Sequence, residues 1–498
     1  METRLLIAGE RVAGAGPSLA VENPATEETI AQVGSASPEQ VDAAIAAARE
    51  AMPGWAGMPA AERGELLHEV ATRLRDRTDE LARVMTLEGG KPLIENSDEV
   101  GWTAACFDFY AELGRTSAGR VIPPIESSQL ALVVKEPVGV VGAIVPWNYP
   151  LLLLAWKLVP ALAAGNPVVC KPSELTPVST LMLAECLEPL PPGTVALLAG
   201  AGEVGEAIVS DERVDCVAFT GSVETGKKIA VRCAERVARM NLEMGGKDPF
   251  IVCADVAADV AVAARGGAWA AFLNAGQVCT SAERFYVQRE VYDDFLSEFV
   301  DHTNSLVVGD PLDPSTDVGP MASANQRAKA AAQVEAAVAA GAEVVTGGGS
   351  AGQSAGHFLS PVVVTGTPPE TDLLREETFG PVAPIVPVGS LDEAIALANG
   401  TRFGLGANVY TRDLETAVRC MREIKAGTVW INDPLTDNDA GPFGGFKQSG
   451  LGRELGIEGL EAFQETKHVH IETRIGPKEW WYPYGGGGAA GPHDGAGA

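Results

Sequence analysis

Residues 138–163 read VGVVGAIVPWNYPLLLLAWKLVPALA, a short β-branched run followed by a turn and an apolar helical segment. The same alternation recurs up to about residue 245. Strands that alternate with helices of about ten residues predict an α/β fold with a parallel sheet covered by helices on both faces. Ligands bind such sheets where strands end and helices begin, so the chemistry is expected at those turns. Later strand signals cover 168–170, 195–198 and 216–219, and helix signals cover 178–187, 204–209 and 225–237.

The rest of the chain extends this pattern in both directions. Residues 37–113 are rich in Ala, Glu, Leu and Arg and predict helices, while residues 246–445 carry a second set of alternating signals. A chain of 498 residues is too long for one compact core, so two or more subdomains are expected. After Gly476 an aromatic cluster, Trp480 to Tyr484, could pack on a neighbouring subunit or on its own chain. The glycine-rich end is expected to be disordered.

Charge and cysteine usage exclude several classes of protein. The 37 basic and 66 acidic residues give a formal net charge of −29. A surface this negative repels nucleic acid and anionic membranes, so neither is an expected partner. The simplest role of the charge is to keep the protein soluble. The start, Met1 to Arg4, shows no signal-peptide pattern, and the most apolar stretch, Leu151 to Trp156, is far short of the roughly 20 residues of a membrane span. Eight scattered cysteines without a CxxC pair indicate reduced thiols in the cytoplasm and no metal site.

Cys279 stands out among the cysteines because of its neighbours. Most buried cysteines serve only as small apolar side chains. Cys279 instead follows the polar, flexible stretch Asn274-Ala275-Gly276-Gln277-Val278, which allows a substrate carbonyl to approach the backbone closely. Histidines are few, so a carboxylate is the better candidate for the base. Glu243 follows a strand-like run and precedes two glycines, so its side chain is expected to emerge at a sheet edge, although most glutamates are only solvated surface acids.

These residues resemble the aldehyde dehydrogenase superfamily. Its glutamate signature matches Leu242-Glu243-Met244-Gly245-Gly246-Lys247, and its cysteine signature matches Phe272-x-Asn274-x-Gly276-Gln277-x-Cys279. Further matches run from Pro146 to Gly452. The resemblance implies a Rossmann-like cofactor domain, an α/β catalytic domain and a small β bridging domain for oligomerisation. The implied ranges are 1–118 with 137–245 for the NAD-binding domain, 246–462 for the catalytic domain, 119–136 with 463–475 for the bridging segments, and 476–498 for the tail.

The resemblance also implies a role for each catalytic residue. Cys279 attacks the aldehyde carbonyl, and Asn148 and the Cys279 backbone N–H bind the oxyanion. Hydride transfer then leaves a thioester, and Glu243 activates the water that hydrolyses it to the free acid rather than a coenzyme A ester. The resemblance also implies that Lys157 is one of the catalytic residues.

A cofactor site follows from the same resemblance. Lys171, Ser173 and Glu174 match the adenosine-ribose site, where a carboxylate would repel a 2′-phosphate, so NAD is favoured and NADP is the alternative. The segment 219–226 matches the pyrophosphate turn; its GxxxxG spacing is weak by itself, and its place between strand and helix supports it. Glu377 and Phe379 match the nicotinamide-ribose site. The further cofactor-binding candidates are Ile144, Val145, Pro146, Trp147, Gly202, Gly205, Phe219, Gly221, Ser222, Met244 and Gly245.

The substrate is less constrained by the sequence. Tyr149, Trp156 and Phe443 are the predicted pocket residues, and aromatic faces can bind a quaternary ammonium. Three nearby acids, Asp433, Asp437 and Asp439, could add negative charge, and the pattern resembles the betaine-aldehyde and aminoaldehyde branch. Plant members of that branch carry a tryptophan at the position that Leu273 occupies in this chain. Two other substrate classes remain alternatives: a hydroxyaldehyde such as lactaldehyde, which Ala282-Glu283-Arg284 favours, and a broad range of apolar aldehydes. Succinic semialdehyde is disfavoured as the substrate because no arginine that could bind its carboxylate is evident.

Two rival functions remain alternatives. Some members with this fold are non-catalytic, and a cysteine with a base can also act as a thiol esterase. All three catalytic residues are present here, and nicotinamide contacts argue against esterase as the main activity. Bridging strands of this family pair between subunits, so a homodimer or homotetramer is expected.

Overall fold

The computed structural model describes residues 1–478, 480–482 and 484. The chain divides into two compact units, Met1–Thr116 with Pro137–Gln464, and Ser117–Glu136 with the residues from Glu465 onwards. The glycine-rich segment expected to be disordered lies outside the described residues.

A mixed sheet organises the first half of the larger unit. Its strands lie in the order β19-β11-β10-β7-β8-β9-β1-β2, and the central pairs, from β11 through β9, are parallel. The alternation read from residues 138–245 is therefore confirmed. The strands are β1 Leu5–Ile7, β2 Glu10–Val12, β7 Val141–Ile144, β8 Val168–Lys171, β9 Val195–Leu197, β10 Cys216–Gly221, β11 Arg239–Met244 and β19 Gly450–Leu451.

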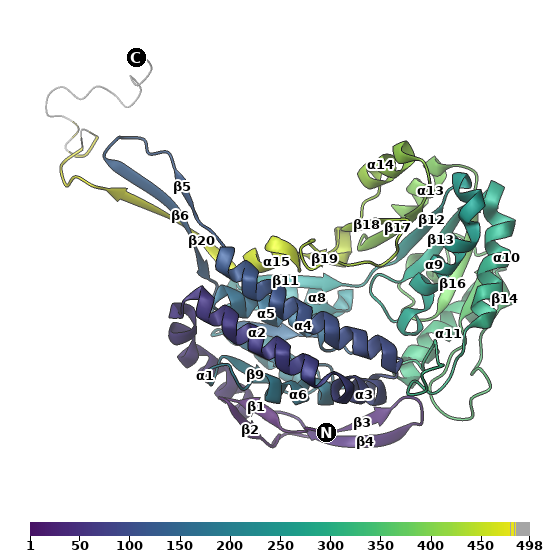
Figure 1. Cartoon of the computed structure of the whole chain (residues 1–498), viewed down its shortest axis with the longest axis horizontal. Coiled ribbons are helices and arrows are strands. Elements are labelled where there is room, and N and C mark those ends of the chain that lie inside the picture. The colour runs from purple at the N-terminus through teal and green to yellow at the C-terminus, as the bar shows by residue number, and fades with distance from the viewer. Residues whose placement is uncertain (479, 483, 485–498) are drawn as a thin grey trace, which may run out of the picture. The chain divides into compact units, whose positions relative to one another are not determined.

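Helices surround this sheet. Helices α2, α4 and α5 pack side by side in Figure 1, and the ribbon of β3 (Ser18–Asn23) and β4 (Glu28–Gly34) lies beside α3 and α6. Capping explains the start of α1: the Ser37 hydroxyl accepts the Gln40 N–H, and the Gln40 side chain accepts the Ser37 N–H. The helices are α1 Pro38–Gly57, α2 Ala60–Asp76, α3 Thr78–Gly89, α4 Leu93–Thr116, α5 Leu152–Ala164, α6 Pro177–Cys186, α7 Gly202–Ser210, α8 Val223–Arg236 and α15 Gly456–Glu461.

A second sheet follows directly after β11. Its order is β14-β15-β16-β13-β12-β17-β18, parallel throughout except between β14 and β15. The strands are β12 Asp248–Val252, β13 Ala282–Gln288, β14 Glu343–Thr346, β15 Val362–Thr365, β16 Val382–Val388, β17 Gly406–Tyr410 and β18 Thr428–Ile431. The helices are η1 Ala254–Asp259, α9 Val260–Phe272, η2 Leu273–Gly276, α10 Arg289–Ser305, α11 Ala324–Ala339, α12 Asp372–Arg375, α13 Leu391–Ala398, α14 Leu414–Glu423 and η3 Lys447–Ser449.

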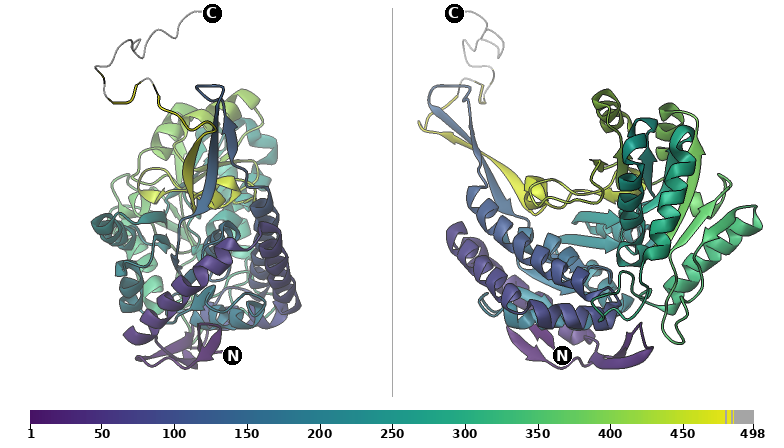
Figure 2. Two further views of the ribbon diagram at one scale, coloured as in Figure 1. Left: turned by 90° about the vertical axis from the view of Figure 1, so that its left-hand side faces the viewer. Right: turned by 45° about the vertical axis from the view of Figure 1, so that its right-hand side comes forward.

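Side-chain alternation along β12 and β13 accounts for the helices on both faces of this sheet. Phe250 and Phe285 pack in one cluster with residues of α9 and α10. Ile251 and Tyr286 point to the other face and pack with residues of α13 and α14. Successive strand residues face opposite sides, so both faces of the sheet are apolar and both are covered (Figure 2).

One stretch in this region has the length and composition of a membrane span. Ala254–Gly276 has a mean hydropathy of 1.3 over its most apolar window. It comprises two 3-10 segments and α9, and the inner face of α9 packs on Phe250 and Phe285 in the core of the second sheet. We therefore assign this stretch to the protein core.

The smaller unit contains a three-stranded sheet in the order β20-β6-β5. Its strands are β5 Arg120–Ile122, β6 Gln129–Pro137 and β20 Gln464–Glu472. Several large apolar side chains of this unit are exposed, among them Val121, Ile125 and Ile471.

Candidate functional site

The backbone just before Cys279 adopts an uncommon conformation. Asn274, Ala275 and Gly276 all have positive φ, at 48°, 54° and 71°. A Cβ on Gly276 would lie 2.2 Å from the Gly380 carbonyl oxygen, so this position accepts only glycine. The signature glycine therefore allows the cysteine loop to pack directly against the segment that carries Glu377 and Phe379.

Side-chain amides hold this loop. The Asn148 amide donates to the Gln277 carbonyl oxygen at 3.0 Å. Gln277 in turn donates from Nε2 to the Asn274 carbonyl at 2.9 Å and accepts the Ala322 N–H at 2.9 Å. Hydrogen bonds from separate segments of the chain thus fix the approach to Cys279.

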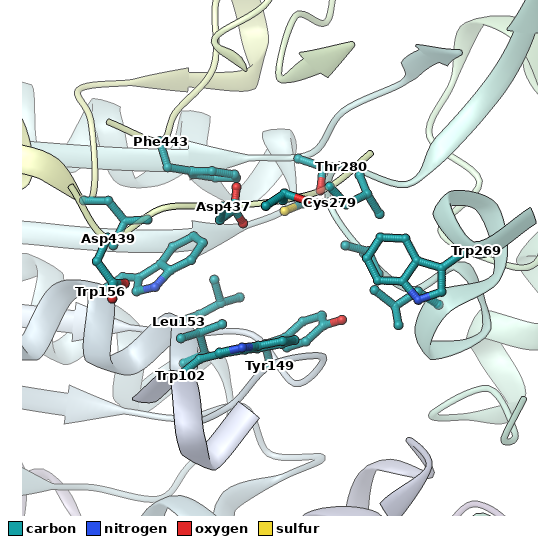
Figure 3. A pocket seen from close by; sticks show the side chains of 16 residues that line it. Trp102, Tyr149, Leu153, Trp156, Trp269, Cys279, Thr280, Asp437, Asp439 and Phe443 are labelled. Carbon is teal, nitrogen blue, oxygen red and sulfur yellow. The ribbon is translucent and has the colours of Figure 1, made fainter. Parts of the chain in front are cut away.

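Two cavities meet at Cys279. One has a volume of about 310 Å³ and the other about 160 Å³, and both are lined by Cys279 and Leu153. In Figure 3 the cysteine sulfur lies on one side of the larger cavity, with Trp102 and Tyr149 on the opposite side. A molecule in either cavity can therefore reach the thiol.

The larger cavity has an aromatic wall. It includes all three predicted pocket residues, and the rings of Trp156 and Phe443 lie 4.9 Å apart. Sequence reasoning missed Trp102 on α4 and Trp269 on α9, which are both about half exposed. The only signal in the sequence was that each is a large aromatic residue within a helical segment. The rest of the lining is Tyr149, Leu152, Leu153, Leu273, Val278, Cys279, Thr280, Leu435, Thr436, Asp437, Asp439 and Leu455.

Two of the three predicted acids border this cavity. Asp437 and Asp439 belong to the lining, whereas Asp433 does not. Asp433 lies between two residues with positive φ, Asn432 and Leu435, and is exposed. Desolvation, reinforced by the charge of Asp439, raises the pKa of Asp437 to about 7.

The Tyr149 ring already has a cation as neighbour. The Lys91 ammonium lies 3.7 Å from its centroid and pairs with the Glu99 carboxylate, which also accepts the Leu151 and Leu152 N–H groups at the start of α5. Part of the cation–π capacity of Tyr149 is thus used within the protein.

The smaller cavity brings together half of the predicted cofactor residues. Its lining includes Pro146, Trp147, Gly221, Ser222, Met244, Gly245, Glu377 and Phe379, together with Asn148, Leu153, Thr220 and Cys279. Sequence reasoning missed Gln326 and Lys329, which reach the cavity from α11. Desolvation raises the pKa of Glu377 to about 7.

The other predicted cofactor residues lie at neighbouring strand ends and helix starts rather than in the cavity lining. A Cβ on Gly205 would lie 3.6 Å from Lys171 Cδ and 3.7 Å from Ile144 Cδ1, so these three residues adjoin. Lys171 is buried, with its ammonium 3.9 Å from the Glu174 carboxylate. Val145 and Ser173 follow β7 and β8, Phe219 lies in β10, and Gly202 begins α7.

The donor set of this region suits a dinucleotide. Ser222, which lines the cavity, caps the 14-residue helix α8 by accepting the Thr225 N–H. The positive end of the helix dipole therefore lies beside the cavity, where it would stabilise a pyrophosphate. Lys171 with Glu174 offers a donor and an acceptor for ribose hydroxyls. The residues present therefore fit the expected cofactor.

The Cys279 thiol is held in its neutral form. Desolvation raises its pKa well above the ordinary value, and the carboxyls of Asp248, Asp437, Glu377 and Glu243 raise it further. A group that accepts the thiol proton, or a cation close to the sulfur, is needed to form the nucleophilic thiolate.

Glu243 is not at a sheet edge, contrary to the sequence prediction. Strand β19 pairs with Leu242 and Glu243 on the outer side of β11, so the glutamate is buried. Its carboxyl lies beside Gly444, Gly445 and Gly450, and among the described residues neither cavity lining includes it. Burial, with the nearby Glu454 carboxyl, raises the pKa of Glu243 well above its ordinary value.

Lys157 and Glu454 form a buried ion pair next to Glu243. The Lys157 ammonium lies 2.6 Å from the Glu454 carboxylate and donates to the Thr220 hydroxyl at 2.5 Å. The charge of Lys157 lowers the pKa of Glu243 while that of Glu454 raises it. The structure therefore links Lys157, which lies on α5, with the predicted base on β11.

Comparisons with known proteins agree with this architecture. Residues 12–469 match the model of the aldehyde dehydrogenase family. The betaine aldehyde dehydrogenase of Bacillus subtilis (strain 168) is 38% identical over 491 residues, covering 97% of this chain and 100% of the relative. The NADP(+) succinate-semialdehyde dehydrogenase of Escherichia coli (strain K12) is 38% identical over 470 residues, covering 94% and 97%. The crystal structure of Staphylococcus aureus betaine aldehyde dehydrogenase in complex with NAD+ superimposes with a TM-score of 0.93 at 36% identity, covering 97% of both chains.

Proposed function

The chain belongs to the aldehyde dehydrogenase family, and from this membership we propose that it oxidises a cationic aldehyde to the free carboxylic acid with NAD. It is an NAD(P)-dependent oxidoreductase. The observation that carries the proposal is the position of Cys279, between an aromatic cavity bordered by carboxyls and a smaller cavity lined by half of the predicted cofactor residues.

Cys279 acts as the nucleophile. Once the thiol proton has passed to water, the sulfur bonds to the aldehyde carbon, and the carbonyl oxygen becomes an oxyanion. The Asn148 amide has two N–H groups, one of which donates to the Gln277 carbonyl, and the other is available to the oxyanion. One such donor is typically worth about 3 kcal/mol of barrier. When bound, the cofactor supplies the hydride acceptor for this oxidation, and a thioester on Cys279 results.

Glu243 acts as the base for hydrolysis of the thioester. It takes a proton from water, the resulting hydroxide adds to the thioester carbon, and the Cys279 sulfur leaves as the acid is released. The carboxyl has to turn from its buried site beside Gly444 to reach that water. Lys157 and Glu454 act by setting the charge around Glu243.

The walls of the larger cavity support a cationic substrate. Its lining, within the described residues, contains aromatic rings and two carboxyls but no Lys or Arg. Aromatic faces and carboxylates attract an ammonium group, whereas a carboxylate-bearing aldehyde such as succinic semialdehyde would meet no counter-charge. Betaine aldehyde or an aminoaldehyde therefore fits best.

Leucines of the same cavity favour a second candidate. Leu152, Leu153, Leu273, Leu435 and Leu455 could accept a neutral apolar aldehyde. A hydroxyaldehyde enzyme would give its highest kcat/KM with lactaldehyde in the assay below, whereas a non-catalytic protein and a thiol esterase would both form no NADH.

The proposed cofactor is NAD rather than NADP. Glu174 lies near Lys171 after β8, where its carboxylate would accept bonds from ribose hydroxyls and repel a 2′-phosphate.

The proposed assembly is a cytoplasmic homodimer or homotetramer. Residues 119–136 and 463–475 are the proposed bridging segments, and the exposed apolar side chains of Val121, Ile125 and Ile471 support a subunit contact there. The proposed domains are 1–118 with 137–245 for the cofactor and 246–462 for catalysis. Strand β19, at residues 450–451, lies within that catalytic range but pairs in the first sheet.

NADH formation with a panel of aldehydes tests the proposal. The panel contains betaine aldehyde, 4-aminobutanal, lactaldehyde, propanal, benzaldehyde and succinic semialdehyde, each with wild type and Cys279→Ala. We expect the highest kcat/KM for the two cationic aldehydes and no NADH from the variant. A preference for neutral aldehydes would refute the cationic substrate, and no NADH from wild type with any aldehyde would refute the dehydrogenase.

A further inference from the structure

A buried ion pair lies outside both cavities and has no part in the chemistry above. The Lys247 ammonium contacts the Glu283 carboxylate at 2.6 Å, and both side chains are almost completely buried. Burying two charges is costly unless their hydrogen bonds are satisfied, so the partners of this pair indicate what it supports.

Glu283 binds the backbone of the segment that follows Glu377. One carboxylate oxygen accepts the Thr378 N–H at 2.8 Å, and the other accepts the Phe379 N–H at 2.7 Å. Phe379 has a φ of 54°, in the left-handed region that bulky side chains rarely occupy. Such a conformation persists only where its surroundings enforce it, and two charge-assisted hydrogen bonds to consecutive N–H groups can do so.

Lys247 adds a third contact to the same segment. Its ammonium donates to the Thr378 hydroxyl at 2.9 Å, and that hydroxyl donates to the Gln333 side chain at 2.7 Å. Thr378 is thus held through both its backbone and its side chain. The two residues beside it, Glu377 and Phe379, line the smaller cavity.

The pair also joins the three segments of the site. Lys247 lies four residues after Glu243, and Glu283 lies four residues after Cys279. The Gly246 N–H, next to Lys247, donates to the Glu377 carboxylate at 3.3 Å. A single buried contact therefore connects the glutamate strand and the cysteine strand with the loop that carries Glu377 and Phe379.

We propose that Lys247 and Glu283 are positioning residues that hold Glu377 and Phe379 in the shape needed to bind the nicotinamide end of the cofactor. The proposal rests on the proposed function, which makes the smaller cavity a cofactor site. It predicts that losing the pair weakens cofactor binding while the reactivity of Cys279 is preserved, because hydrogen bonds of Asn148, Asn274 and Gln277 hold the thiol loop in addition to its contact with Gly380.

Glu283→Gln tests this with little change in side-chain volume. The variant keeps one acceptor oxygen but loses the charge and the second acceptor. We expect the Kd for NAD, measured by calorimetry on the purified full chain, to rise about tenfold or more. Hydrolysis of p-nitrophenyl acetate without cofactor, which needs only Cys279 and a base, should stay within about twofold of wild type.

Two further variants keep the test decisive. Asp255→Asn is the matched control, since Asp255 also accepts two consecutive N–H groups, those of Arg412 and Asp413, away from both cavities; its Kd should not change. Should Glu283→Gln fail to fold, Thr378→Val replaces it, because this isosteric change removes the hydroxyl that bonds to Lys247 and Gln333. We expect a smaller rise in Kd from Thr378→Val, again with esterase activity retained.

Each possible result of these measurements either supports or overturns the positioning role. An unchanged Kd for NAD in Glu283→Gln, or in Thr378→Val if it is the variant that folds, overturns the positioning role. An equal loss of NAD binding and esterase activity also overturns it, because a general structural defect would produce both. If wild type forms no NADH from any aldehyde, the proposed function fails, and the binding measurement still decides the positioning role.

Discussion

At the scale of single residues, the site contains several carboxyl groups whose pKa values burial raises. The pKa values of Cys279 and Glu243 are both raised by desolvation, so burial disfavours the thiolate of the proposed nucleophile and the carboxylate of the proposed base. Each must lose a proton to act. The rate of the enzyme is therefore expected to increase from neutral into alkaline pH.

The pair next to Glu243 predicts opposite shifts of that pH profile. Glu454→Gln removes a negative charge that raises the pKa of Glu243 and leaves the Lys157 cation unpaired, so the rise in kcat should move to lower pH, on the order of one unit. Lys157→Met removes the cation that lowers this pKa, so the rise should move to higher pH. The measurement is kcat against pH; shifts in the same direction would contradict the assigned roles.

Asp437 predicts a pH-dependent substrate preference. Its carboxyl borders the larger cavity with a pKa of about 7, so it is ionised above this pH and neutral below it. The ratio of kcat/KM for 4-aminobutanal over propanal should thus be larger at about pH 8.5 than at about pH 6. Asp437→Asn should lower the ratio at the higher pH by about threefold to tenfold. Asp433→Asn, which changes an acid outside the lining, should leave it unaltered; equal effects from both variants would show only a long-range charge effect.

At the scale of elements, the site depends on close packing between loops. The cysteine loop touches the segment that carries Glu377 at Gly276 and Gly380, and Glu283 binds that same segment from β13. Backbone contacts of this kind admit no side chain between them. We therefore expect these loops to be sensitive to a side chain added at either glycine.

Gly276→Ala tests this packing. The added methyl would lie 2.2 Å from the Gly380 carbonyl oxygen and would occupy a φ of 71°, so we expect a loss of about 1–3 kcal/mol in the free energy of unfolding and a strong loss of NADH formation. Gly349→Ala is the control, because Gly349 has a similar φ of 74° but no atom within 4 Å of the added carbon. Urea denaturation should show a smaller loss for Gly349→Ala. Equal losses would mean that φ alone, and not the contact, restricts Gly276.

At the scale of the whole molecule, the larger unit contains two mostly parallel sheets that follow each other in sequence. Only Gly245, Gly246 and Lys247 separate β11 from β12. Cys279 and Glu243 therefore lie at the ends of segments that belong to different sheets. The smaller unit, with its exposed apolar strands, contributes no residue to either cavity lining among those described.

The exposed side chains of the smaller unit predict how the protein assembles. Ile125→Asp should reduce the molar mass measured by light scattering after gel filtration, because a charge at a buried subunit contact is costly. Leu414→Asp, at an exposed apolar residue of α14, is the control and should leave the mass unchanged. A monomeric wild type, or an unchanged mass for Ile125→Asp, would refute the proposed contact.

The amino-acid sequence alone was enough to predict the fold class, the order of strands and helices in 138–245 and the family. Local periodicity predicts the elements, because apolar side chains must recur on the buried face of each strand or helix. The signature residues around Glu243 and around Cys279 are each contiguous in the chain, so the linear sequence is sufficient to recognise them.

The residues that complete the site come from distant parts of the chain, and the packing of the elements determines which they are. Trp102, Trp269, Gln326 and Lys329 reach the cavities from helices far apart in sequence, and the linear sequence does not show that these helices meet. The same holds for Glu243, which is buried because β19, more than 200 residues later, pairs alongside β11. Contacts between distant segments depend on how the elements pack in three dimensions, and the periodicity that forms each element does not contain that information.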